Sequence, residues 1–144
     1  SSNLEVAAAA QLVDLISVKK EDLLLLQELL LPVKIHLDRT RNAFDVWTLS
    51  HNQKPSETIE DKIFKSNVFI RDLLVEIWYL VPSQLKKDAL MLIDHYNDWI
   101  NEYFRVRPEG KRLDEPKYIF VGSFPSNAEH NFLNLFEEIV KKPK

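Results

Sequence analysis

Four basic side chains around a turn are the residues whose types and spacing are best suited to binding chemistry. Arg105 and Arg107 precede a Pro-Glu-Gly turn, and Lys111 and Arg112 follow it. Guanidinium and ammonium groups gathered there could hold a phosphate, a carboxylate or an acidic partner through charge-assisted hydrogen bonds. Cations at a helix C-terminus also stabilise its dipole without any ligand, and acidic residues interleave with these four. We therefore carry two interpretations, an anion or partner site and a solvated helix end.

A second set of candidates begins at Arg41-Asn42. This dipeptide matches the start of an Arg-Asn-x-x-x-His motif, but Val46 occupies the histidine position and His51 lies ten residues after Arg41. In this dipeptide, its size and its number of helices, the chain resembles the HEPN superfamily of ribonucleases. That resemblance implies a dimeric helical bundle. With Val46 in place of histidine, it implies a nucleic-acid-processing or defence-associated relative with a degraded Arg-x(4-6)-His motif.

Other catalytic and metal sites are not indicated. The chain has no cysteine, which excludes disulfides, thiolate zinc sites and cysteine nucleophiles. Its four histidines fall on four different segments, and neither an HExxH nor a GxSxG motif is present. Asp94, Asp98 and Glu102 share a helix face, but that face is opposite the apolar one and is best explained as solvated. We expect no metal and no cofactor, and we favour a protein without enzymatic activity.

Composition places the chain among single helical domains. It has 144 residues, of which 45% are hydrophobic and 28% charged, and this is enough for one core over residues 1–144. The absent initiator methionine suggests excision from a longer chain. A net charge of −3 supports nucleic acid only weakly as a partner. No signal-peptide pattern and no transmembrane segment is indicated, because the apolar runs are far shorter than about 20 residues. We therefore expect a cytoplasmic protein.

Apolar residues at spacings of three, four and seven predict an all-α fold. The expected helices cover residues 4–16, 21–50, 56–81 and 84–106, with a last helix from Ser126. Pro32 should kink or divide the second. Residues 108–126 form the one long irregular stretch, in which residues 118–121 are expected to cross the bundle as a strap. The prediction is a bundle of five to six helices around a long antiparallel hairpin over 56–106.

The apolar stripes predict which side chains form the core of the hairpin. On its second helix we expect eight to face inward: Leu85, Ala89, Leu92, Ile93, Tyr96, Trp99, Ile100 and Tyr103. The last helix has the pattern of a capping box, Ser126-x-x-Glu129, which should satisfy its first N–H groups.

Leucines between Leu23 and Leu31 cover every side of a helix, more than one neighbouring helix can bury. Such a helix is either central in the bundle or shared with a partner chain. We therefore predict a non-enzymatic interaction or regulatory module that acts through helix faces, as a homodimer or with a protein partner. The HEPN-like protein is the alternative.

Overall fold

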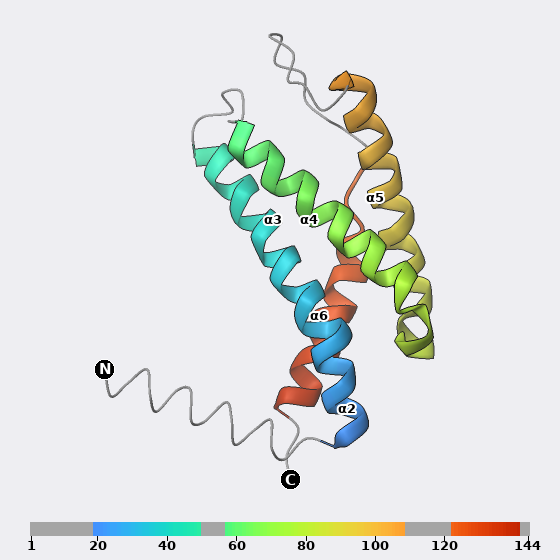
Figure 1. The fold of residues 1–144 in the computed structure, drawn as a ribbon. Helices are drawn as coiled ribbons and strands as arrows, with labels where there is room; N and C mark the ends of the chain where they lie inside the picture. The colour runs from blue at the N-terminus through green and yellow to red at the C-terminus, as the bar shows by residue number, and fades with distance from the viewer. Residues whose placement is uncertain (1–18, 50–56, 109–121, 142–144) are drawn as a thin grey trace, which may run out of the picture.

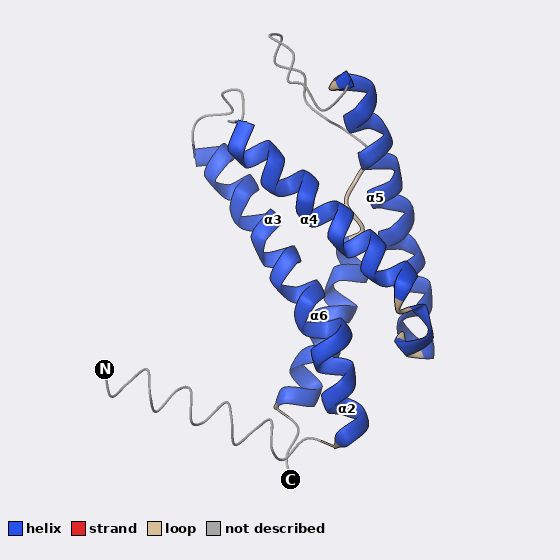
Figure 2. Ribbon diagram, in the orientation of Figure 1, coloured by secondary structure: helices blue, strands red, loops and turns tan. Residues whose placement is uncertain are grey.

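The computed structural model describes residues 19–49, 57–108 and 122–141, with the side chains of 47–49, 57 and 58 left out. This part of the chain is all-α and contains no strand (Figure 2). Its long helices are α3 (Leu31–Leu49), α4 (Glu57–Glu76), α5 (Lys86–Val106) and α6 (Ser126–Val140). None of the described helices is long and apolar enough to cross a membrane. The helix expected over 4–16 and the strap expected at 118–121 lie outside the described residues. The residues that would decide whether the bundle has five or six helices also lie outside them.

Helices α3, α4 and α5 lie in a row, with α4 in the middle (Figure 1). The chain passes along α4 and returns along α5, through short 3₁₀ turns at Trp78–Leu80 and Ser83–Leu85. Helix α6 packs against α5, against the early part of the first helical run and against α3. A single hydrophobic core fills the space between these helices.

The first helical run continues through Pro32 instead of stopping there. Helix α2 (Lys20–Leu25) leads into a π-turn over Leu26–Leu30, which leads directly into α3. Proline has no N–H to donate, and its ring collides with the carbonyl four residues earlier. The wider π-turn falls on the residues just before Pro32, where such an adjustment relieves that collision. We call residues 20–49 the first helix below.

The periodicity of the sequence correctly predicts the buried side of α5. All eight side chains expected to face inward between Leu85 and Tyr103 are buried. On α4, Ile63, Ile70 and Leu74 are buried as well, and Ile77 is half-buried. Stacked aromatic rings fill the α4–α5 contact near the end of α5, with Phe64 and Tyr103 centroids 4.3 Å apart.

The capping box expected at the start of α6 is not formed. Pro125 occupies the N-cap position, and no side chain caps the helix. The Ser126 hydroxyl lies 3.5 Å from the carbonyl oxygen of Phe124, and Glu129 instead forms an ion pair with Arg41 of α3. The Glu129 carboxylate, which the local pattern predicted at the N-terminus of α6, therefore forms a long-range ion pair instead.

Candidate functional site

The predicted basic cluster is divided in the structure, beginning with Arg105. This residue is exposed on the last turn of α5, where its Nε donates to Glu102 Oε2 at 3.0 Å. Hydrogen bonding to the guanidinium lowers the pKa of Glu102 and raises that of Arg105. Lys111 and Arg112 lie outside the described residues. Arg105 is the one described member of the cluster that remains at the surface, and its charge is already partly neutralised.

Arg107 is inside the protein, with 1% of its side chain exposed. Its Nε donates to Glu60 Oε1 at 2.8 Å and its Nη2 to Glu60 Oε2 at 3.3 Å. This two-point pair joins the end of α5 to the start of α4 and satisfies a carboxylate that would be costly to bury alone. Arg107 therefore contributes to the fold and is closed to an external anion.

The HEPN-like candidates do not converge within the described residues. Arg41 points to α6 and forms its ion pair with the buried Glu129. That carboxylate lies near Tyr96, whose pKa is raised by burial and further by the charge of Glu129. Asn42 instead lines a groove toward α4, and His51 lies outside the described residues. Neighbours in sequence are thus directed to different sides of α3.

The groove beside Asn42 runs between α3 and α4 and has a volume of about 280 Å³. Asn42, Ala43 and Val46 form its α3 wall, and Ile59 contributes from α4. Two cations, Arg39 and Lys62, also line it. In the described part of the chain neither of them makes an ion pair. The groove therefore combines apolar walls from Ala43, Val46 and Ile59 with the Asn42 amide and two cations.

One turn further along the same contact, His36 bridges α3 and α4. Its Nδ1 lies 3.0 Å from the Ser66 hydroxyl, and its ring stacks on Phe69 with centroids 4.0 Å apart. Burial lowers the pKa of His36, and the nearby Arg39 cation lowers it further. This pair has the form of a satisfied helix–helix contact, so we assign it no catalytic role.

The outward side of the first helix carries large apolar side chains that nothing in the described chain covers. Along α3 they are Leu31, Ile35 and Val46, exposed from 43% at Leu31 to 53% at Ile35. Leu24, which is 47% exposed, lies on α2 before the π-turn. The inward side, with Leu26, Leu29, Leu30, Val33 and Leu37, is fully packed. The all-round leucine pattern is thus divided between a core side and an open side. We call the open side, together with the Arg39–Lys62 groove at its edge, the outer face.

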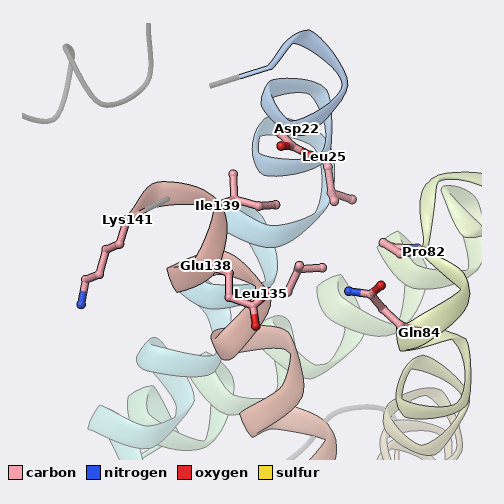
Figure 3. A pocket seen from close by; sticks show the side chains of 8 residues that line it. All are labelled: Asp22, Leu25, Pro82, Gln84, Leu135, Glu138, Ile139 and Lys141. Carbon is pink, nitrogen blue, oxygen red and sulfur yellow. The ribbon is translucent and has the colours of Figure 1, made fainter. Parts of the chain in front are cut away.

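A larger cleft, about 580 Å³, lies between α2, α6 and the turn at 82–84 (Figure 3). Its floor is apolar, formed by Leu25, Pro82, Leu135 and Ile139, and the carboxylates of Asp22 and Glu138 are at its edge. Lys141 extends away from it (Figure 3) and pairs with Glu137. The cleft contains none of the predicted site residues, and three distant segments build it, so no local motif could have indicated it.

Comparisons with protein-family models, with curated proteins and with solved structures found no match for this chain. In the described residues no three His, Asp or Glu side chains are grouped as a metal site would require. Among the described surfaces, the outer face combines an apolar row with charge at its border. Leu31 belongs to the leucine run noted in the sequence. Ile35 and Val46 follow Leu31 by four and fifteen residues, and these spacings could have placed them on the same side of the helix.

Proposed function

We propose that this protein is a helical interaction module that acts through the outer face of the first helix and self-associates there. The observation that supports this most directly is the exposed row of Leu31, Ile35 and Val46 along α3. Isolated apolar residues on a surface are ordinary, but a row along one helix next to a partly apolar groove is typical of interaction sites. The opposite side of the same helix is buried in the core.

The charges at the edge of this face favour a specific association over non-specific hydrophobic association. Arg39 and Lys62 provide positive charge on one border, while Asp38 on the same helix is paired with Lys34. Apolar contacts with a charged rim are the usual anatomy of a reversible protein interface. A regulatory module needs such a surface and needs no catalytic group.

The alternative, an HEPN-like protein with a degraded motif, requires Arg41 in a basic groove at a dimer interface. The ion pair of Arg41 with Glu129 directs this guanidinium toward α6, away from the Arg39–Lys62 groove. The interaction module needs no such convergence, and we therefore prefer it.

Sedimentation velocity on the full chain tests the proposal. We expect a dimer at tens of micromolar, with an interface of at least about 1,000 Å². Ile35→Glu should weaken association at least about tenfold, because it buries an unpaired charge at the centre of the interface. Val75→Glu is the matched control, since Val75 is equally apolar and exposed but lies on α4 away from this face. A wild-type chain that remains monomeric at about 100 µM, well above ordinary micromolar affinities, would contradict the proposal.

A further inference from the structure

The cleft between α2, α6 and the turn at 82–84, called the α2–α6 cleft below, has the size of a small-molecule site. Its volume of about 580 Å³ falls within the roughly 300–1,000 Å³ of ordinary ligand pockets. Leu25 on α2, Pro82 in the turn and Leu135 on α6 line it and are each half-buried (Figure 3). Covering such apolar surface with a hydrocarbon is favourable. The cleft can therefore hold an apolar body of several carbons.

Two carboxylates at the edge of the cleft lack a cation. Asp22 is half-buried on α2, and Glu138 is exposed on α6. Neither makes an ion pair in the described part of the chain. Lys141 also lines the cleft, but it extends away from it (Figure 3) and pairs with Glu137 at 2.7 Å. The edge of the apolar floor is therefore negatively charged.

The position of Glu138 makes its charge unfavourable in the free protein. Glu138 lies in the last turn of α6, and that turn contains no basic residue. A helix dipole is negative at its C-terminus, so it destabilises a carboxylate there and stabilises a cation. Asp22 lies in the first turn of α2, where the dipole has the opposite effect. A cation bound beside Glu138 would thus relieve an unfavourable interaction that the described chain leaves in place.

We propose that the α2–α6 cleft binds a small primary alkylammonium ion. The hydrocarbon chain covers the apolar floor, and the ammonium group lies at the edge, where Asp22 and Glu138 attract it. A primary ammonium has three N–H donors, and its hydrogen bonds to carboxylates are charge-assisted. The Gln84 amide extends toward the cleft (Figure 3) and offers a further acceptor. This site is separate from the outer face and does not rest on the proposed function.

A free amine suits this cleft better than the lysine side chain of a partner protein, although both present an alkylammonium. The stem and head of a lysine contain five heavy atoms. If each takes about the 30 Å³ of a liquid water, they fill only about a quarter of the cleft. A longer hydrocarbon chain covers more of the floor and gains roughly fourfold in affinity for each methylene that it buries.

Ligands that share a six-carbon chain test recognition of the charged head. Hexylammonium, hexan-1-ol and hexanoate are titrated into the isotope-labelled full chain, and the shifts of its backbone amide signals are followed by NMR. Hexylammonium should bind with a Kd of a few millimolar or tighter, shifting signals around Leu25, Gln84 and Glu138. Hexan-1-ol should bind about tenfold more weakly, and hexanoate more weakly still. Equal binding of the alcohol, or no shift with hexylammonium at about 20 mM, overturns the inference.

Chain length distinguishes a free amine from a lysine side chain. Butylammonium reproduces the four-carbon stem of lysine, and hexylammonium should bind at least about fivefold more tightly, because two further methylenes reach the floor. Nα-acetyl-lysine amide, which carries a peptide backbone, should bind no more tightly than butylammonium. An affinity that stops rising at four carbons, or tighter binding of the lysine derivative, overturns the assignment to a free amine.

Isosteric variants test the two carboxylates. Asp22→Asn and Glu138→Gln should each weaken hexylammonium binding about threefold, as expected for an exposed ion pair. The double variant should lose about tenfold. Asp94→Asn removes the same charge from an exposed position on α5 that does not line the cleft, and it should have no effect. Equal losses in all three single variants would indicate only the net charge of the protein and would overturn the site.

A lysine placed in the cleft by mutation should compete with the ligand. Gln84 is exposed, so Gln84→Lys keeps the fold and brings an ammonium group of the chain itself to Asp22 and Glu138. It should weaken hexylammonium binding at least about fivefold, whereas Gln84→Met, of similar length and without charge, should change it less than about twofold. Unchanged binding in Gln84→Lys overturns the proposed position of the ammonium.

Sedimentation velocity separates this inference from the proposed function. Asp22 and Glu138 are not part of the outer face, so their double variant Asp22→Asn, Glu138→Gln should retain the association of the wild-type chain. Ile35→Glu should in turn retain the affinity for hexylammonium. A loss of amine binding in Ile35→Glu would place the amine at the outer face and overturn the assignment to the α2–α6 cleft.

Discussion

The α4–α5 contact and the outer face of the first helix carry similar apolar side chains but differ in what covers them. Between α4 and α5, Ile70 and Leu74 are completely buried, and the Arg107–Glu60 pair closes one end. On the outer face Leu31 and Ile35 remain about half exposed. Hydrophobic stabilisation is proportional to the apolar area removed from water. The first contact therefore contributes to folding within the described chain, while the second can contribute only when something binds.

The largest effect is expected at the closed contact, from Arg107→Ala. This change leaves Glu60 buried without its cation and should lower the free energy of unfolding by about 3–5 kcal/mol. Urea unfolding followed by circular dichroism measures it. The double variant Glu60→Leu, Arg107→Met removes both charges and should be much less destabilised. If the double variant were no more stable than Arg107→Ala, the loss would come from packing and not from the stranded carboxylate.

Leu74→Ala should destabilise the same contact by about 2–5 kcal/mol, because it removes a fully buried side chain and leaves a cavity. Val75→Ala, one residue further along α4, changes a side chain that is 59% exposed and should cost less than about 0.5 kcal/mol. Thermal or urea unfolding of both variants compares the two sides of one helix. Equal losses would mean that α4 is rotated relative to the structure.

Arg41→Ala should have an intermediate effect, since Arg41 is 64% exposed but its partner Glu129 is almost buried. Removing a charged hydrogen-bond partner from such a carboxylate costs about 1–3 kcal/mol. Water can reach the site from the Arg41 side, so the loss should be smaller than for Arg107→Ala. A larger loss in the same urea assay would show that the α3–α6 contact is the more tightly closed of the two.

His36 should make stability depend on pH at the edge of the outer face. Burial and the Arg39 cation hold its pKa below the ordinary 6.5, so the unfolded chain binds protons that the folded chain does not. The free energy of unfolding should fall as pH drops from above 6.5 through the lowered pKa, and then level off. Burial lowers the pKa of His95 too, so it contributes in the same direction. His36→Gln should reduce this slope, measured by urea unfolding at a series of pH values.

The smallest effect on folding is expected from Ile35→Ser on the outer face. The side chain is 53% exposed, and its loss should change the free energy of unfolding of the monomer by no more than about 0.5 kcal/mol. The measurement is urea unfolding at submicromolar concentration, where the dimer is dissociated. A loss above about 1 kcal/mol, the ordinary cost of a more buried substitution, would mean that Ile35 is covered within the chain.

The positions of the helices and their buried sides could be predicted from the sequence because both depend on local chemistry. An apolar residue every three or four positions selects a helix and its inward side together, as on α5. The π-turn before Pro32 could be predicted only in part. A disturbance was predicted at the proline, but its form depends on the packing of Leu26, Leu29 and Leu30 into the core, which holds the helix continuous.

The partners of charged residues could not be predicted in the same way. Arg105 and Arg107 are two positions apart and similar in sequence context, but one is exposed beside Glu102 and the other is buried against Glu60. The Glu60 carboxylate is separated from Arg107 by 47 positions, and no local spacing connects them. The same applies to Glu129, which pairs across 88 positions with Arg41.

The sequence by itself determined that this protein is helical, where its later helices run and which of their side chains face inward. These properties follow from backbone propensity and from the period of apolar residues, both of which act over a few positions. Only the tertiary structure decided which cations are neutralised and which half of the leucine-rich helix stays open. Burial and ion pairing depend on which distant segments meet, and the candidate surface is what those contacts leave uncovered.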